Sequence, residues 1–435
     1  ARAAETEPKQ ADTGRAVRRS LSQTGRYVRQ PTNDVTSNDL MEEHGVGYSS
    51  RGLVAQMREN GNRWTQGDVS VKLAKAYGYC WGVERAVRMA YEARQLFPGA
   101  KLHMTNEIIH NPQVNQRMRE FDINIIVDEG SGKDYSKVDT GDVVIFPAFG
   151  ATVQELQFFR DKGVQMVDTT CPWVAKVWNA VDTHAKKECT SIIHGKYSHE
   201  ETIATASFAS QYLIIKDLKE AQYVIDYILN GGNKEEFLAK FSKAMSKGFD
   251  PDTMLDKIGL ANQTTMLKGE TEQMGKMLEA CMMKKYGPDK LNKHFLLMDT
   301  ICDATQERQD AMYELTADGT GGVDMMLVVG GFNSSNTSHL QEIAEHKSIP
   351  SFWVDGAVRI DVANNTILHK MMTGELVETK NWLKPGQKVT IGVTSGASTP
   401  DSSVEDVLDC VFRIMDPSYT GIQPRDCAPL QVPTH

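Results

Sequence analysis

The chain has little cysteine for its length, and none of its cysteines form close pairs. Seven cysteines are spread over 435 residues, unlike the dense spacing of a disulfide framework, so we expect a reducing compartment. No uninterrupted apolar stretch approaches the roughly 20 residues that a membrane-spanning helix needs, so we expect no membrane span. The 48 basic and 57 acidic residues give a net charge of −9, which argues against a nucleic acid or an anionic membrane as partner.

Familiar nucleotide and metal motifs are also missing. No G-x-G-x-x-G follows an expected strand, so a dinucleotide site for nicotinamide or flavin is not indicated. The segment 191–197 lacks both the leading Gly and the Ser or Thr of a P-loop, and 199–203 lacks the second histidine of a zinc-protease helix. Electrons for a redox reaction would therefore have to come from a partner.

From about residue 68 the chain alternates short β-rich runs with longer amphipathic stretches. This pattern is typical of a parallel α/β fold. We predict three similar α/β modules with mainly parallel sheets, in a pseudo-threefold arrangement around one central site. The predicted parts are an N-terminal extension, partly disordered, at 1–67; module 1 at 82–171; module 2 at 172–298, with a solvated insertion near 230–256; module 3 at 68–81 and 299–415; and a C-terminal tail at 416–435.

Three cysteines share one local setting. Cys80, Cys171 and Cys302 each follow a β-rich run and open a helix-patterned segment. A thiolate at a strand's carboxyl end, beside a helix N-terminus, is placed to bind a metal at the rim of a sheet. Because 91 and 131 residues separate them, the fold would have to assemble such a site. The other cysteines are interpreted as background: Cys189, Cys281, Cys410 and Cys427.

Three thiolates are one short of closing a tetrahedral zinc site or fully ligating a cubane cluster. An iron–sulfur cluster held by three cysteines would offer a Lewis acid and an electron source at one point, whereas zinc with an open position would offer only the first. Two other functions remain as alternatives: a hydro-lyase that uses the cluster as a Lewis acid, and a non-enzymatic iron–sulfur sensor or carrier.

Polar loops supply candidate ligands for an anion. Residues 330–336 precede a helix expected to begin near Thr337, and their Gly, Ser and Asn residues can cradle a phosphate or simply cap that helix. Residues 396–400 form a second small-residue loop with the same two interpretations. His110 and His199 are candidates to serve a phosphate or a proton.

Six motifs occur in the order seen in 4-hydroxy-3-methylbut-2-enyl diphosphate reductases, so the chain resembles that family and, within it, the plant and cyanobacterial branch. The motifs are 78–86, 106–111, 168–172, 262–265, 333–336 and 396–398.

The resemblance implies the last step of the non-mevalonate isoprenoid pathway. The reaction would be reductive dehydroxylation of (E)-4-hydroxy-3-methylbut-2-enyl diphosphate to isopentenyl diphosphate and dimethylallyl diphosphate. A central [4Fe–4S] cluster would be ligated by Cys80, Cys171 and Cys302, with one iron open to the substrate hydroxyl. Two electrons would come from a donor such as reduced ferredoxin, and the oligomeric state is left open.

The resemblance also implies the plastid stroma, that is, the chloroplast, as the location. The chain begins at Ala1, and its first thirty residues are rich in Arg, Ser, Thr and Gln, as expected for the remnant of an organelle-targeting region. Glu5, Glu7 and Asp12 suit an ordinary disordered tail equally well.

Roles for single residues follow from the resemblance. Glu201, His199 and Thr264 would serve catalysis, with Glu201 delivering protons. Bacterial members carry a histidine where this chain has Phe149, so one diphosphate contact is missing or is replaced by Lys196. The implied substrate-binding residues are His110, His199, Thr264, Thr265, Ser334, Ser335, Asn336 and Ser398.

Overall fold

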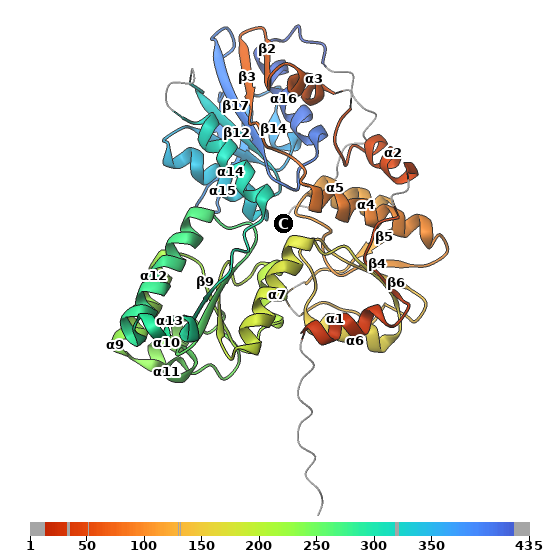
Figure 1. Ribbon diagram of the computed structural model, residues 1–435. Coiled ribbons are helices and arrows are strands. Elements are labelled where there is room, and N and C mark those ends of the chain that lie inside the picture. The colour runs from red at the N-terminus through yellow and green to blue at the C-terminus, as the bar shows by residue number, and fades with distance from the viewer. Residues whose placement is uncertain are drawn as a thin grey trace, which may run out of the picture.

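The computed structural model describes residues 14–32, 35–50, 52–128, 130, 132–317 and 322–421. Cys427, the first thirteen residues and most of the predicted C-terminal tail lie outside this part of the chain. Three lobes surround the middle of the molecule, and each is built on one sheet with helices packed against it (Figure 1). The predicted α/β class with mainly parallel sheets is therefore confirmed. The exact limits of the three modules stay a prediction.

The first sheet has five strands, all parallel, in the order β1-β7-β6-β4-β5. Its central strand β6 is buried along its whole length, as expected for a parallel strand covered on both faces. The strands are β1 (Tyr27–Val28), β4 (Leu102–Met104), β5 (Ile123–Ile125), β6 (Val143–Phe146) and β7 (Gln165–Asp168), and the helices of this lobe are α1 (Gly14–Ser22), α2 (Val35–Glu43), α4 (Trp81–Leu96), α5 (Pro112–Glu120) and α6 (Val153–Lys162).

The second sheet has four parallel strands in the order β11-β10-β8-β9. Its strands are β8 (Thr190–His194), β9 (Tyr212–Ile215), β10 (Ile258–Asn262) and β11 (Phe295–Leu297). Its helices are α7 (Pro172–Lys186), α8 (Glu200–Ser207), α9 (Leu218–Asn230), α10 (Lys234–Lys240), α11 (Pro251–Met254), α12 (Lys268–Tyr286) and α13 (Leu291–His294), with a 3₁₀ turn at Pro288–Lys290.

The segment 230–256 is helical and largely exposed, as expected, but it also has a buried side. Phe237, Phe241 and Phe249 are 0%, 2% and 4% exposed and join the core of the second lobe. Glutamates precede these rings and lysines lie between them, so the segment looks polar in the sequence. Burial of three aromatic rings holds it against β9 and α9.

The third sheet joins distant parts of the chain, in the order β14-β15-β13-β12-β17-β3-β2, with β16 paired to β15. Its centre is parallel and its edges are antiparallel. Its strands are β2 (Arg63–Gln66), β3 (Val69–Leu73), β12 (Met325–Val329), β13 (Ser351–Val354), β14 (Ile360–Asp361), β15 (Thr366–Lys370), β16 (Leu376–Lys380) and β17 (Val389–Ser395). Its helices are α3 (Leu53–Glu59), α14 (Asp303–Leu315), α15 (Ser335–His346) and α16 (Asp401–Met415), with a 3₁₀ turn at Ala357–Arg359.

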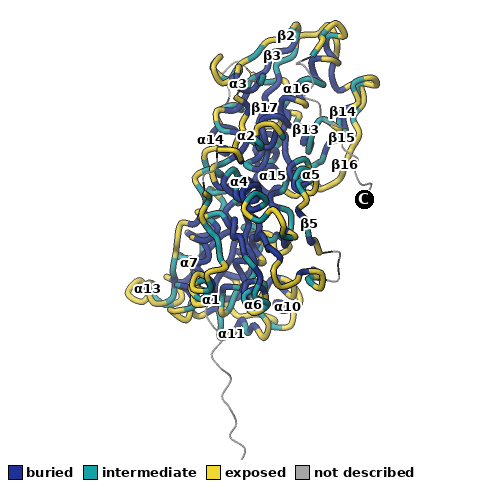
Figure 2. Tube along the Cα trace, turned by 90° about the vertical axis from the view of Figure 1, so that its right-hand side faces the viewer, coloured by how far each residue is buried: buried dark blue, intermediate teal, exposed yellow. Residues whose placement is uncertain are grey.

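The described part of the N-terminal extension is folded onto the body. Val17 and Leu21 of α1 are fully buried in the core of the first lobe, and β1 adds to its sheet beside β7. A continuous buried interior runs through the lobes in side view (Figure 2). Helix α1 was not predicted from the sequence, because so short a helix needs only two or three core residues. None of the described helices is long and apolar enough to cross a membrane.

We predict that α1 contributes measurably to stability. Leu21→Ala should lower the free energy of unfolding by about 2–5 kcal/mol, since it removes a fully buried side chain and leaves a cavity. The exposed neighbour Gln23 gives the matched control, and Gln23→Ala should stay within about 0.5 kcal/mol of the parent. Urea unfolding followed by circular dichroism measures both, and equal midpoints would show that α1 does not pack as described.

Candidate active site

The three sheets present the same set of strand ends to the centre. In each sheet three neighbouring strands are parallel, so their carboxyl ends lie at one edge. The first strand of each trio leads to a cysteine, the second to a small loop and the third to a polar loop. In the first sheet, Cys171 follows β7, Phe149 follows β6 and His110 follows β4. In the second sheet, Cys302 follows β11, Thr264 follows β10 and His199 follows β8. In the third sheet, Cys80 follows β3, Ser398 follows β17 and Ser334 follows β12.

Each cysteine is anchored by its own backbone. The amides of Cys80, Cys171 and Cys302 donate to the carbonyls of Ala397, Ala148 and Thr264, at N···O distances of 3.2, 2.8 and 3.5 Å. All three acceptors belong to the small loop on the adjacent strand. The same cysteines are the N-cap residues of α4, α7 and α14. The predicted succession of strand, cysteine and helix is confirmed at each position.

The three cysteine thiols line one pocket, and their surroundings suit a cofactor that the protein alone does not supply. Burial raises the pKa of the Cys171 thiol to about 12 and that of Cys302 to about 11, and the neighbouring cysteines add to both shifts. Gly82 lets α4 approach closely, because a Cβ there would lie 2.5 Å from Cys171 Sγ. The sulfur of Cys302 accepts from the Thr305 amide at 3.3 Å. Three partly buried soft donors therefore fit a cationic cofactor that would stabilise them as thiolates.

Two buried arginines tie the cysteine loops together. Arg308 of α14 donates to the carbonyl oxygens of Gly78 and Tyr79, at 2.6 and 2.9 Å, and so links the Cys302 helix to the Cys80 loop. Arg85 of α4 reaches the carbonyls of Thr169 and Thr170, both at 3.4 Å, and so links the Cys80 helix to the Cys171 loop.

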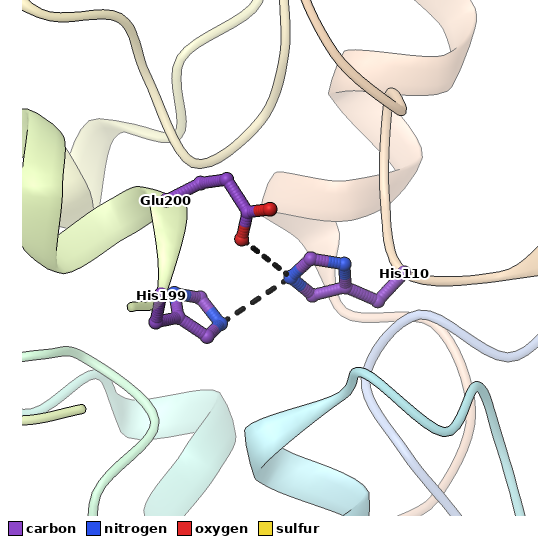
Figure 3. A group of neighbouring side chains, drawn as sticks. All are labelled: His110, His199 and Glu200. Atoms are coloured by element: carbon purple, nitrogen blue, oxygen red, sulfur yellow. Dashed lines mark hydrogen bonds and ion pairs between the residues drawn. The ribbon is translucent and has the colours of Figure 1, made fainter. Parts of the chain in front are cut away.

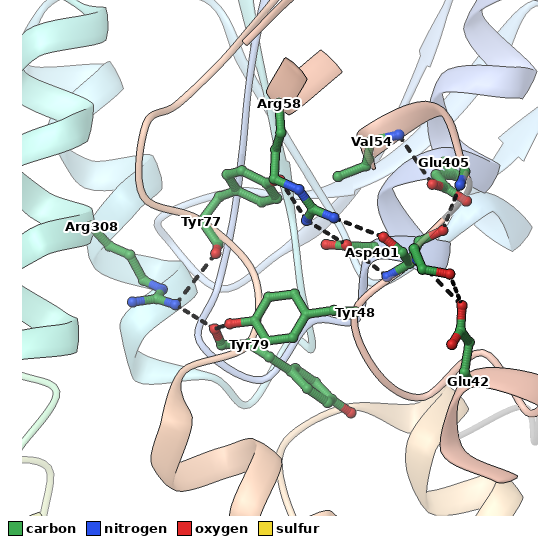
Figure 4. Close-up of polar contacts among 12 residues, drawn as sticks. Glu42, Tyr48, Val54, Arg58, Tyr77, Tyr79, Arg308, Asp401 and Glu405 are labelled. Carbon is green, nitrogen blue, oxygen red and sulfur yellow. Dashed lines mark hydrogen bonds and ion pairs between the residues drawn. The ribbon is translucent and has the colours of Figure 1, made fainter. Parts of the chain in front are cut away.

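The N-terminal segment braces the Cys80 loop from its other side. The Tyr48 hydroxyl donates to the carbonyl of Tyr79. Arg58 donates to the carboxylate of Asp401 at 2.8 Å and to the Tyr77 hydroxyl at 3.1 Å (Figure 4). These contacts connect the extension, the cysteine loop and the start of α16.

All of the catalytic, substrate-binding and cysteine residues named from the resemblance line one pocket. Its lining includes two side-chain atoms that are buried but have no hydrogen-bond partner among the described residues: Ser335 Oγ and Asn336 Nδ2. Unpaired buried donors are costly unless a ligand satisfies them. His199 and Ser334 in this lining are the N-cap residues of α8 and α15, and a helix N-terminus favours an anion.

Two histidines and a glutamate meet in the polar wall (Figure 3). Nε2 of His110 lies 3.3 Å from Nε2 of His199 and 3.7 Å from Oε2 of Glu200. One ligand atom from each lies within 4.8 Å of the other two, a spacing that could also hold a metal ion. The Nδ1 atom of His199 accepts from the amide of Glu201 at 3.2 Å.

Glu201 is a buried carboxyl group held by Thr264. The Thr264 amide donates to its Oε1 at 2.6 Å and the Thr264 hydroxyl to its Oε2 at 3.0 Å. Burial raises the pKa of Glu201 to about 7, although both hydrogen bonds act in the opposite direction. The group can therefore hold a proton near neutral pH beside the pocket.

Phe149 stacks on His110, with ring centroids 4.6 Å apart and planes 15° apart. Lys196 is not among the described residues that line the pocket, and its backbone amide is bonded to Gln263 Oε1 at 3.2 Å. A contact of Lys196 with the diphosphate stays a prediction. Glu107, Glu200, Gly82, Arg85 and Arg308 were missed, although three of them lie within the quoted motifs. Apart from Glu107, which contacts His110 in its own loop, their contacts join residues far apart in the chain.

The family described as LytB protein matches residues 71–412, which is most of the chain. The chain belongs to the LytB protein family. A chloroplastic 4-hydroxy-3-methylbut-2-enyl diphosphate reductase from Botryococcus braunii is 64% identical over 416 residues, covering 95% of this chain and 83% of the relative. A 4-hydroxy-3-methylbut-2-enyl diphosphate reductase from Crocosphaera subtropica is 56% identical over 399 residues, covering 92% and 97%.

Among solved structures, the E-1-hydroxy-2-methyl-but-2-enyl-4-diphosphate reductase from Plasmodium falciparum matches with a TM-score of 0.57 and 21% identity, covering 78% of this chain and 86% of that one. At this identity the match establishes a shared fold. Membership of the LytB family rests on the sequence comparisons.

Gly82 provides a test of the cysteine pocket. Gly82→Ala should displace the Cys171 thiol, because the new methyl group would overlap Sγ, and we expect anaerobically prepared protein to bind several-fold less iron. Gly99 in the same lobe has open space around its Cα, so Gly99→Ala is the matched control. Iron analysis and thermal unfolding would be measured together. Full iron content in a folded Gly82→Ala protein would contradict the close approach.

Proposed function

We propose that the chain catalyses the reductive dehydroxylation of (E)-4-hydroxy-3-methylbut-2-enyl diphosphate to isopentenyl diphosphate and dimethylallyl diphosphate. The observation that carries this proposal is one pocket, in a chain of the LytB family, that is lined both by three cysteines and by hydroxyl, amide and imidazole side chains. In the reaction one C–O bond breaks and one C–H bond forms. Two electrons and two protons are consumed, and water leaves.

Cys80, Cys171 and Cys302 are the proposed ligands of a [4Fe–4S] cluster with one open iron. When bound, such a cluster supplies electrons and a Lewis acid at the same place. The protein's part is to bring three sulfurs from three sheets to one point, which the anchored amides and the two arginines support. Arg308 is fully engaged by backbone oxygens, so it acts on the loop geometry rather than on the substrate.

The polar wall is the proposed diphosphate site. Ser335 Oγ and Asn336 Nδ2 are buried donors in need of an acceptor, and the N-terminus of α15 adds a favourable field. His110, His199, Ser334 and Ser398 complete this wall. With the diphosphate held there, the hydroxyl end of the five-carbon chain would point toward the cysteines. Positioning of this kind lowers the reaction barrier, because the substrate has already lost its translational and rotational entropy on binding.

Glu201 and Thr264 are the proposed route for a proton. A protonated Glu201 can donate from Oε2 to Thr264 Oγ1, whose own hydrogen is then free to point into the pocket. Hydroxide is a poor leaving group from carbon, so delivery of a proton to the departing oxygen lowers the barrier. Thr265 lines the pocket beside this pair.

The reaction needs an external electron donor, for which we propose reduced ferredoxin in the plastid stroma. A plastid location is supported by the chloroplastic relative from Botryococcus braunii. Ferredoxin fits because it is a one-electron carrier that can act twice per turnover.

The proposed function is tested by counting electrons. Under anaerobic conditions the iron-loaded protein should consume two equivalents of reduced ferredoxin per product formed, because C–O cleavage here is a two-electron reduction. Substrate loss and products are followed by mass spectrometry. Turnover with no reductant would replace this function with a hydro-lyase activity.

The cysteines supply the controls for that experiment. Cys302→Ser should lose iron, sulfide and turnover, because serine is a poorer ligand for iron. Cys410 lies away from the pocket, and Cys410→Ser should retain all three.

Glu201 should control the pH dependence of turnover. Its raised pKa keeps the proton on the group up to about pH 7, so kcat should fall as pH rises through that value. Glu201→Gln should lower kcat by roughly 10²–10⁴-fold while substrate still binds. Thr264→Val should lose the relay hydroxyl, whereas Thr264→Ser keeps it and should retain most of kcat. An unchanged pH profile in Glu201→Gln would exclude Glu201 as the donor.

A further inference from the structure

The proposed diphosphate wall has few sources of positive charge. Among the described residues that line the pocket, His110 and His199 are the side chains that can become cationic. A diphosphate ester carries at least two negative charges near neutral pH. The groups that contact each histidine decide which of the two supplies the positive charge that compensates the diphosphate.

His199 is held in its neutral form. Burial lowers its pKa well below the ordinary range, and the nearby His110 and Lys196 act in the same direction. Its Nδ1 atom accepts the amide proton of Glu201, so the single ring proton is on Nε2. That proton points at His110 Nε2, 3.3 Å away. His110 Nε2 is therefore an acceptor before a ligand binds, and the proton of His110 lies on Nδ1.

His110 lies between two carboxylates and against an aromatic face. Its Nδ1 lies 3.6 Å from Oε2 of Glu107, and its Nε2 lies 3.7 Å from Oε2 of Glu200. Its face is stacked on Phe149, whose π-cloud stabilises a cation. The titratable groups that face it are Glu107 from its own loop and His199, Glu200 and Glu201 from the start of α8.

We infer that Glu107 and Glu200 are positioning residues that make His110 the cation of the diphosphate site, so that binding of the anion is coupled to uptake of one proton at His110 Nε2. An anion placed between the histidines needs two donors where the ligand-free pair has one. His199 already donates from Nε2, and the proton of His110 stays on Nδ1, which faces Glu107, so His110 must gain a second proton to donate from Nε2. This inference rests on the proposed function, since it takes the ligand to be a diphosphate.

The two carboxylates act from different sides. Glu107 holds the Nδ1–H end of the ring and also lines a groove beside α5 and the 3₁₀ turn at Ala357–Arg359, so it connects His110 with solvent. Glu200 lies on the Nε2 side, at the N-terminus of α8. Phe149 supports the ring of His110 by stacking on it, so this position has a role even without the histidine of the bacterial members.

The test measures diphosphate binding as a function of pH. The anaerobic iron-loaded protein is titrated with inorganic diphosphate by calorimetry at pH 6, 7 and 8, in buffers of different ionisation enthalpy, which gives both affinity and proton uptake. Glu107→Gln keeps the size and hydrogen-bonding capacity of the side chain but removes its charge. We expect it to bind about tenfold more weakly than the parent at pH 8, to take up fewer protons there, and to differ by less than about threefold at pH 6.

Asp122→Asn is the matched control, because it removes a carboxylate from the same lobe at a side chain that is 99% exposed. It should bind like the parent at every pH. Glu200→Gln should shift the pH dependence in the same direction as Glu107→Gln. A loss of affinity in Glu107→Gln that is equal at pH 6 and pH 8, with parental proton uptake, would overturn the inference and leave Glu107 with a structural role.

Two further outcomes separate the alternatives. If a chelator abolishes binding in the parent and in Glu107→Gln alike, a cation bridges the three side chains to the ligand, and the inference is overturned. Substrate turnover in the parent is recorded in parallel. Turnover with identical pH profiles in parent and variant would refute the role of Glu107 alone, whereas a parent that neither binds diphosphate nor turns over would refute the proposed function as well.

Discussion

The structure depends on one repeated hydrogen bond, from the amide of each site cysteine to a carbonyl in the loop of the adjacent strand. It fixes where each sulfur leaves its sheet. Arg85 and Arg308 then hold the cysteine loops together, because each spans from one cysteine helix to the loop of another cysteine. Both guanidinium groups are buried, so their bonds to backbone oxygens must be kept.

The pocket divides its work between two chemically distinct walls. Sulfur donors with raised pKa values face a wall of hydroxyl, amide and imidazole groups. Glu201 accepts hydrogen bonds from the amide and hydroxyl of Thr264 rather than from a basic side chain. In the proposed binding mode, charge compensation would lie at the diphosphate end of the substrate, away from the cysteines.

Local pattern was enough to predict the class of fold and the cysteine settings, because strand, cysteine and helix are adjacent in the chain. The placement of Thr264, Ser335 and Asn336 in one pocket followed from family resemblance, and its assignment to substrate stays a prediction. Hydrophobic periodicity could not reveal α1 or the packing of the segment around Phe237, because only a few residues of either segment enter a core. Nor could it reveal Arg308 or the stacking of Phe149 on His110, because these contacts join residues that are far apart in the chain.

The pairing of β3 with β17 has a consequence for how the protein is made. Val69 pairs with Val389, so the strand that leads to Cys80 finds its place only after nearly the whole chain has been synthesised. Cys171 and Cys302 can reach their own sheets earlier, because β7 and β11 pair with strands that precede them in the chain. A cofactor that needs all three sulfurs, such as the proposed cluster, could therefore be completed only after β17 has been made, at the loop that Tyr48 and Arg58 contact.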